Sequence, residues 1–69
     1  MVIFEYDKEA NAAYIYLKYP IKEGDAKKTI ALNDDIILDF DKDEKLIGVE
    51  VLSASRILIR KVLTEAKAV

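Results

Sequence analysis

Apolar and polar residues alternate along most of this chain, and the spacing becomes helical only near its C-terminal end. Segments rich in β-branched and aromatic residues occupy 2–6, 12–19, 27–32, 35–41 and 46–52. Within each segment the alternation has a period of two, and short polar stretches or a Gly- and Pro-containing loop separate them. Short connections join antiparallel neighbours, because parallel pairs need long crossovers. The pattern therefore predicts an antiparallel five-stranded β-meander.

The C-terminal segment has the spacing of an amphipathic helix. Wound at a helical period, its apolar positions fall on one side, while basic and polar residues fall mainly on the other. The apolar positions are Leu58, Ile59, Val62, Leu63, Ala66 and Val69. We predict one α-helix over about 55–67, packed on one face of the sheet. The fold class is then α+β, with residues 1–69 forming a single domain.

The alternation also assigns the strand residues to two faces of the predicted sheet. One face is almost purely apolar, and we expect the helix to cover it: Phe4, Ile15, Leu17, Ile30, Leu32, Ile36, Leu38, Phe40, Val49 and Val51. The other face mixes carboxylates with tyrosines and isoleucines: Ile3, Glu5, Tyr14, Tyr16, Lys18, Thr29, Ile37, Asp39, Gly48 and Glu50. This face is more apolar than solvation requires, so we predict an interface around Tyr14, Tyr16, Ile37 and Glu50. The alternative is that these are ordinary scattered surface residues.

Composition restricts how so small a chain is stabilised. Its 69 residues are 52% hydrophobic and 35% charged, with no Cys and no His. Disulfides, thiolate zinc sites and imidazole chemistry are thereby excluded, and a chain of this size usually needs some additional source of stability. A hard-cation site, self-association or binding to a small protein partner, and efficient packing are the sources of stability that remain. The absence of Gln, with abundant Lys, Glu and Ile, is typical of thermophile proteins.

The length of the apolar runs bears on localisation. No run approaches the roughly 18 residues of a membrane span. The first residues lack the basic start and long apolar core of a signal peptide. We therefore expect a cytoplasmic protein without a membrane partner.

The stretch DFDKDEKLIGVE, residues 39–50, has the ligand spacing of a calcium-binding EF-hand loop. Carboxylates stand at its positions one, three, five and twelve. The match fails at position six, where Glu44 replaces the usual Gly, and at position nine, where Ile47 offers no side-chain ligand. A β-hairpin explains the same letters, with the carboxylates facing outward or lying in the turn. Looser Ca²⁺ binding stays open, with the candidate metal ligands Asp39, Asp41, Asp43 and Glu44.

Two further activities find little support in the residues. A net charge of −2 disfavours nucleic-acid binding, although Arg56, Arg60, Lys61 and Lys67 could touch phosphates. Such a set is more often the solvated side of a helix. Catalysis would require a pocket among the carboxylates Glu5, Asp39 and Glu50, and no His is present to activate a serine. We therefore expect no enzyme activity and no required cofactor.

Two sequence blocks, YDKEANAAYIYL (6–17) and IILDFDKDEKLIGVEVLSAS (36–55), resemble an uncharacterised family of bacterial and archaeal proteins. It is the domain-of-unknown-function family 2283. The matching positions are Tyr6, Asp7, Glu9, Ala13, Tyr14, Ile15, Asp39, Asp41, Gly48, Glu50, Leu52, Ala54 and Ser55. The chain departs from the family at Asn11, where members usually have Asp, and at Glu44, where Gly is commoner. The resemblance implies a small β-meander with a C-terminal helix, and it suggests an antitoxin-like role beside a small toxin.

The sequence alone thus predicts a small non-enzymatic protein-interaction module. Self-association, or binding to another protein, through the mixed sheet face or through an exposed edge strand is the leading hypothesis. Divalent-cation binding at residues 39–44 and an antitoxin-like role are the alternatives.

Overall fold

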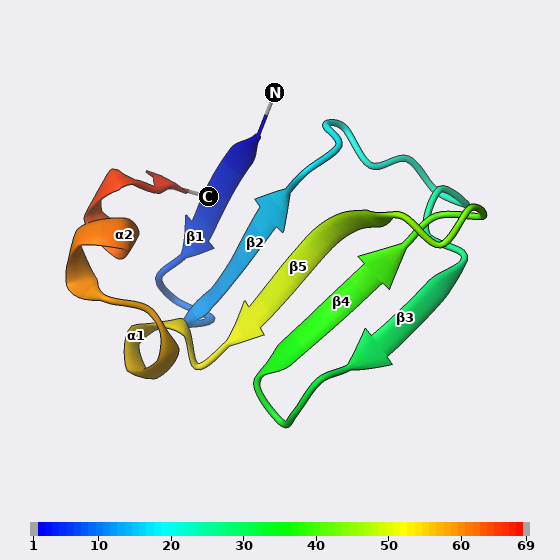
Figure 1. Cartoon of the computed structure of the whole chain (residues 1–69). Helices are drawn as coiled ribbons and strands as arrows, with labels where there is room; N and C mark the ends of the chain where they lie inside the picture. The colour runs from blue at the N-terminus through cyan, green and yellow to red at the C-terminus, as the bar shows by residue number, and fades with distance from the viewer. Residues whose placement is uncertain (1, 69) are drawn as a thin grey trace.

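A computed structural model describes residues 2–68 of the chain (Figure 1). Within these residues, six strands and two short helices make an α+β fold. Their bounds are β1 Ile3–Asp7, β2 Ala12–Tyr16, β3 Lys28–Ala31, β4 Ile36–Phe40, β5 Leu46–Leu52, α1 Ala54–Ile57, α2 Arg60–Glu65 and β6 Lys67–Ala68. Each of the five segments expected to be extended contains a strand, and the second strand ends at Tyr16 rather than at residue 19.

The strand order differs from the predicted meander. The sheet runs β3-β4-β5-β2-β1-β6, so β2 and β3 follow each other in the chain but are not neighbours. The long connection between them contains Pro20 and Gly24. It takes the chain from β2 to the edge of the sheet that β3 forms. The longest strand, β5, then returns between β4 and β2, with antiparallel partners on both sides. Placing β5 in the centre satisfies both edges of this apolar strand, which a meander would leave half unpaired.

The prediction of one C-terminal helix is also wrong. The chain forms two short helices, because Leu58 and Ile59 adopt extended backbone angles between them. These residues belong to the run Ile57–Ile59, in which β-branched side chains weaken helix propensity. After α2 the chain pairs with β1 as the two-residue strand β6, which is parallel and makes the sheet mixed. Val69, predicted for the apolar side of the helix, lies outside the described residues.

Strand register confirms the assignment of strand residues to two faces. One row across the sheet joins Ile30, Leu38, Val49, Ile15 and Phe4, all on the apolar face. The next row, on the mixed face, joins Ala31, Ile37, Glu50, Tyr14 and Glu5. A register irregularity near Asp39 and Phe40 sets Leu46 opposite Phe40. Leu17, Lys18 and Leu32, which alternation also predicts on these faces, lie just beyond the strand ends.

The two helices cover only one half of the apolar face. Ala13, Val51 and Ala54 form the buried cluster, and Phe4, Tyr6, Val49, Ile57, Leu58 and Leu63 pack against it. We call this the covered half. In Figure 1 both helices lie on the side of β1 and β2, and no helix accompanies β3 and β4. The expectation of a helix over the whole apolar face is therefore met only in part.

No helix lies over the remainder of the apolar face, and we call it the open half. It consists of Ile15, Ile30, Ile36, Leu38, Phe40 and Leu46, none of which packs against the buried cluster. Ile30 is 40% exposed and Leu46 38% exposed, and the other four are half-buried. One more apolar side chain, Ile47, is buried within β5 but stands apart from the cluster.

The result is a flat molecule with a large surface. Its principal extents are 33 × 25 × 17 Å, and its radius of gyration is 11.9 Å, against about 11 Å for a compact chain of this length. The accessible surface is 5016 Å², whereas a folded monomer of this mass exposes about 4,400 Å². Within residues 2–68, neither helix has the length or apolar character needed to cross a membrane.

Candidate functional site

The open half is the largest feature that the fold leaves unexplained. At its outer edge all four residues of β3 are exposed, including Ile30. Next to β3, strand β4 contributes Ile36, Leu38 and Phe40 to the open half. The alternating residues Ile37 and Asp39 point to the mixed face. Period-two alternation in β4 therefore builds an apolar surface that the short C-terminal tail does not reach.

On the mixed face, Tyr14 links the two halves of the sheet. From β2 its hydroxyl donates a 2.5 Å hydrogen bond to Oδ2 of Asp39 in β4, across the intervening β5. Thr29 of β3 donates to Oδ1 of the same carboxylate at 2.7 Å. Asp39 thus accepts hydrogen bonds from both sides. Burial, followed by the hydrogen bond to Asp39, raises the pKa of the Tyr14 hydroxyl.

Gly48 makes this link possible. It lies in β5 between Tyr16 and Asp39, and the Tyr14 ring passes over it. A Cβ at this position would lie 2.1 Å from the Tyr14 hydroxyl oxygen, well inside van der Waals contact. The requirement for glycine here is one of space for the tyrosine, and the backbone angles of Gly48 are not left-handed.

The four residues predicted as an interface lie together on the mixed face. Glu50 stands opposite Tyr14 on one side and Ile37 on the other, and the Tyr14 and Tyr16 ring centroids are 4.6 Å apart. All four side chains are half-buried. Burial raises the pKa of Tyr16 as well, with a contribution from Glu5. The interface itself stays a prediction, and the more exposed apolar strand residues lie on the opposite face.

The carboxylates considered for catalysis do not converge on one pocket. Glu5 and Glu50 border a hollow of about 150 Å³ on either side of Tyr14, together with Asp7. Asp39 is not part of its lining and is engaged by Tyr14 and Thr29. Ligand pockets usually measure about 300 Å³ or more.

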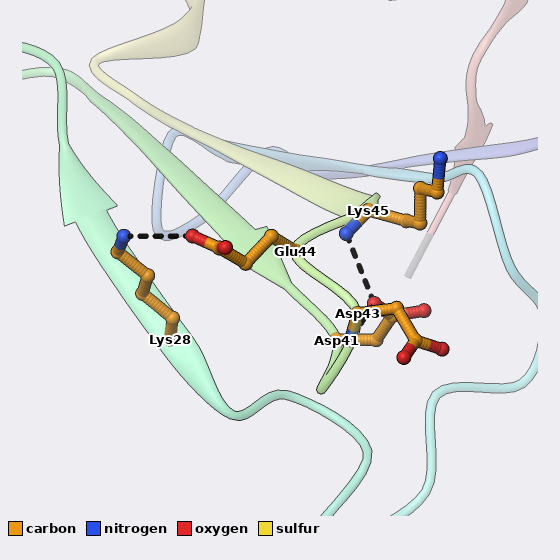
Figure 2. A network of polar contacts seen from close by, with 5 residues as sticks. All are labelled: Lys28, Asp41, Asp43, Glu44 and Lys45. Carbon is orange, nitrogen blue, oxygen red and sulfur yellow. Dashed lines mark hydrogen bonds and ion pairs between the residues drawn. The ribbon is translucent and has the colours of Figure 1, made fainter.

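The acidic residues 39–44 have the arrangement of a hairpin turn. Asp41 accepts hydrogen bonds at Oδ1 from the backbone N–H groups of Asp43, at 2.8 Å, and Lys45, at 2.9 Å. Glu44 points away from them to Lys28, 3.4 Å distant (Figure 2). Asp39 belongs to the Tyr14 link. Between residues 2 and 68 no group of three potential ligands gathers around one point. The geometry favours the hairpin interpretation, and calcium binding stays a prediction.

Sequence reasoning missed the role of Asn11, which connects the first turn to α1. Its side-chain oxygen accepts hydrogen bonds from the Tyr6 hydroxyl at 3.1 Å and the Ser55 backbone N–H at 3.0 Å. Its Nδ2 donates to Ser55 Oγ at 3.0 Å, and its backbone carbonyl accepts from Ala54 at 2.9 Å. The available signal was the co-occurrence of Tyr6, Ala54 and Ser55 among the family-like positions.

The basic residues of the tail are divided between two surroundings. Arg56 forms an ion pair with Asp35 at the end of the connection between β3 and β4. Arg60 begins α2 and is exposed. Arg56 is thus engaged by a carboxylate, whereas Arg60 makes no ion pair within residues 2–68.

Comparison with known proteins gives a family and no activity. The sequence model described as "Protein of unknown function (DUF2283)" matches residues 3–55. The uncharacterized protein MJ0789 of Methanocaldococcus jannaschii is 40% identical over 57 residues. That alignment covers 81% of this chain and 44% of the relative, so the chain spans less than half of the relative's length. No solved structure matches the chain.

Proposed function

Because the chain belongs to the DUF2283 family, whose function is unknown, we propose from its structure that it is a self-associating interaction module. Two copies meet through the open half of the apolar face. The observation that carries this proposal is an apolar sheet surface that no helix covers, formed by Ile30, Leu38 and Phe40 and their neighbours.

The size of the exposed surface supports a second copy as the occupant. The accessible surface of 5016 Å² exceeds the value expected for a compact monomer by about 600 Å². A standard interface removes about 800 Å² from each partner. One further copy would thus bring the surface into the range of a compact protein.

The chain's own stability argues in the same direction. No side chain larger than alanine is below 2% exposure in the described chain, and there are no cysteines. Chains of this size rarely build enough core alone. A second copy is present whenever the first is, so it supplies the missing layer without depending on another protein. It would convert a single-layer half into a face-to-face packing of two sheets.

The chemistry of the open half suits contact with an identical surface. Its centre contains no charged side chain, so a two-fold axis through it brings apolar groups together without opposing like charges. Lys28, opposite Phe40, stands at one end of the surface and forms an ion pair with Glu44. The mixed face is less suited, because the Tyr14 hydroxyl and Asp39 are already bonded to each other.

Neighbouring residues of β4 offer a matched experiment, because Leu38 faces the open half and Ile37 the mixed face. We expect sedimentation equilibrium to show a wild-type dimer, a monomeric Leu38→Lys variant and a dimeric Ile37→Lys variant. Far-UV circular dichroism confirms that each variant is folded. A strictly monomeric wild type at high concentration contradicts self-association. Dissociation by Ile37→Lys alone moves the interface to the mixed face.

A further inference from the structure

A second feature, a cleft on the covered half, is independent of the open surface. It has a volume of about 570 Å³ and lies between β1, the start of α1, α2 and β6. This is within the range of small-molecule pockets. Its lining is Tyr6, Lys8, Ser55, Arg60, Leu63, Thr64, Ala66 and Ala68.

The walls of the cleft combine apolar side chains with hydrogen-bond donors. Tyr6, Leu63 and the two alanines provide an apolar surface. Ser55 Oγ accepts a hydrogen bond from Asn11 Nδ2, which leaves its own hydroxyl hydrogen free to donate. The Tyr6 hydroxyl is directed to Asn11 and holds that ring in place. The Asn11 network therefore fixes two of the cleft's side chains before any ligand arrives.

The charge of the cleft is opposite to that of the whole chain. Among residues 2–68, Lys8 and Arg60 line it and no acidic residue does, although the net charge of the chain is −2. Within residues 2–68 neither cation has a carboxylate oxygen within ion-pair distance, unlike Arg56, Lys18 and Lys28. Two cations and a free hydroxyl above an apolar wall match a ligand with a negative head and an apolar body.

We propose that this cleft binds a small amphipathic monocarboxylate, such as a medium-chain alkanoate. Arg60 and Lys8 hold the carboxylate, with Ser55 donating a hydrogen bond to it. The apolar chain lies against Tyr6, Leu63 and Ala66. Nothing in this proposal depends on self-association, because the cleft and the open half involve different residues.

Octanoate is a suitable probe, used below its micelle concentration and followed by two-dimensional NMR of the ¹⁵N-labelled full chain. We expect saturable shifts at Tyr6, Leu63 and Ala66. Octanol lacks the charge and inorganic phosphate lacks the apolar body. Octanol and phosphate should each bind at least about tenfold more weakly than octanoate. The loss of a charged hydrogen bond, or of the apolar contacts, lowers affinity by about this factor.

Two arginines provide the matched variants. Arg60→Gln should weaken octanoate binding about tenfold, whereas Arg56→Gln, which alters the pair with Asp35 outside the cleft, should leave it unchanged. Lys8→Gln is the second test of the cationic pair. The proposal is overturned if octanoate gives no saturable shift, if Arg60→Gln and Lys8→Gln both bind like the wild type, or if the shifts map to Leu38 and Phe40.

Discussion

The two halves of one sheet face show what an alternating pattern specifies and what it leaves open. In the covered half, Val51 is 3% exposed beneath Ala54, while in the open half Ile30, on the same face, is 40% exposed. Both halves have the same period-two arrangement of apolar residues. They differ only in what lies above them, because the tail breaks at Leu58 and Ile59 and returns to β1. Alternation therefore specifies which residues lie on the apolar face. Which of them a second layer buries depends on the tertiary structure.

The opposite face ties these halves together. Tyr14 starts in β2, beside the covered half, and reaches Asp39 in β4. The link passes over Gly48 and continues to Thr29. The open half is thus anchored from behind while its front is uncovered.

Introducing a charge should have its largest effect in the covered half. Val51→Lys buries an ammonium group beneath Ala54, and we expect it to cost more than about 4 kcal/mol, enough to unfold the chain. Leu38→Lys should leave the monomer folded, because the open half is accessible to water in one copy. Thermal unfolding followed by circular dichroism distinguishes them. Equal destabilisation of the two variants at low protein concentration would contradict the difference in burial between the covered half and the open half.

The link between the halves depends on the space at Gly48. Replacing a strand glycine by alanine usually stabilises a protein by about 0.5–1 kcal/mol, but here the new Cβ would collide with Tyr14. We expect Gly48→Ala to destabilise by about 2–3 kcal/mol through displacement of Tyr14 and loss of its charged hydrogen bond. Urea denaturation measures this change. A stabilising Gly48→Ala variant would show that Tyr14 does not occupy this place.

Removing the Tyr14 hydroxyl tests the same link more gently. Tyr14→Phe should cost about 1–2 kcal/mol at neutral pH, since the bond to Asp39 is lost and Thr29 still donates to that carboxylate. Urea denaturation at pH 7 measures this loss. Tyr19→Phe, in an exposed ring, is the control and should change stability little.

The same variant gives a pH signature. The folded state raises the Tyr14 pKa, whereas tyrosine in the unfolded chain ionises near pH 10. This contribution to stability is therefore complete below about pH 10 and is lost as the pH rises toward the folded pKa. The slope is at most about 1.4 kcal/mol per pH unit, reduced by solvent screening. Wild type should lose more stability than Tyr14→Phe between about pH 9.5 and 11.5, and parallel profiles would contradict the link.

The smallest effect is expected at Glu44, one of two residues with positive φ whose replacement by glycine should act in opposite directions. Glu44 has φ 60° in the open half's hairpin and Asn11 has φ 52° beside the covered half. Glu44→Gly relieves a left-handed backbone at the expense of an exposed ion pair, so we expect it to stabilise by up to about 1 kcal/mol. Asn11→Gly should destabilise, because the bonds to Tyr6 and Ser55 disappear. Chemical denaturation measures the change in the free energy of unfolding for each variant. Changes of the same sign at Glu44 and Asn11 would contradict the different roles given to the two side chains.

Local pattern predicted much of the fold and less of its assembly. Strand positions and the two faces followed from alternation, since side chains such as Ile37 and Leu38 must point to opposite sides. The central place of β5 and the parallel strand β6 did not follow, because strand order depends on long-range pairing that no local period encodes. The helix break at Leu58 was missed for the same reason: an amphipathic period persists through two residues that the tertiary structure extends.

The candidate sites show the same limit. The grouping of Tyr14, Ile37 and Glu50 followed from alternation, but the bond from Tyr14 to Asp39 depends on a register two strands away. The spacing of a calcium loop is a feature of the linear sequence, and calcium binding stays a prediction. In the structure these carboxylates have different partners, with Asp41 accepting hydrogen bonds from backbone amides and Glu44 paired with Lys28. The Asn11 network joins residues 44 positions apart, which a single sequence does not reveal.

Isotope-filtered nuclear Overhauser spectroscopy on a mixture of labelled and unlabelled chains most directly tests whether two copies meet through the open half. We expect intermolecular contacts among the methyl and ring protons of Ile30, Leu38 and Phe40, and none at Tyr14 or Tyr16. Intermolecular contacts confined to the tyrosine face, or none in a sample concentrated well above the dissociation constant of a typical dimer, would contradict it.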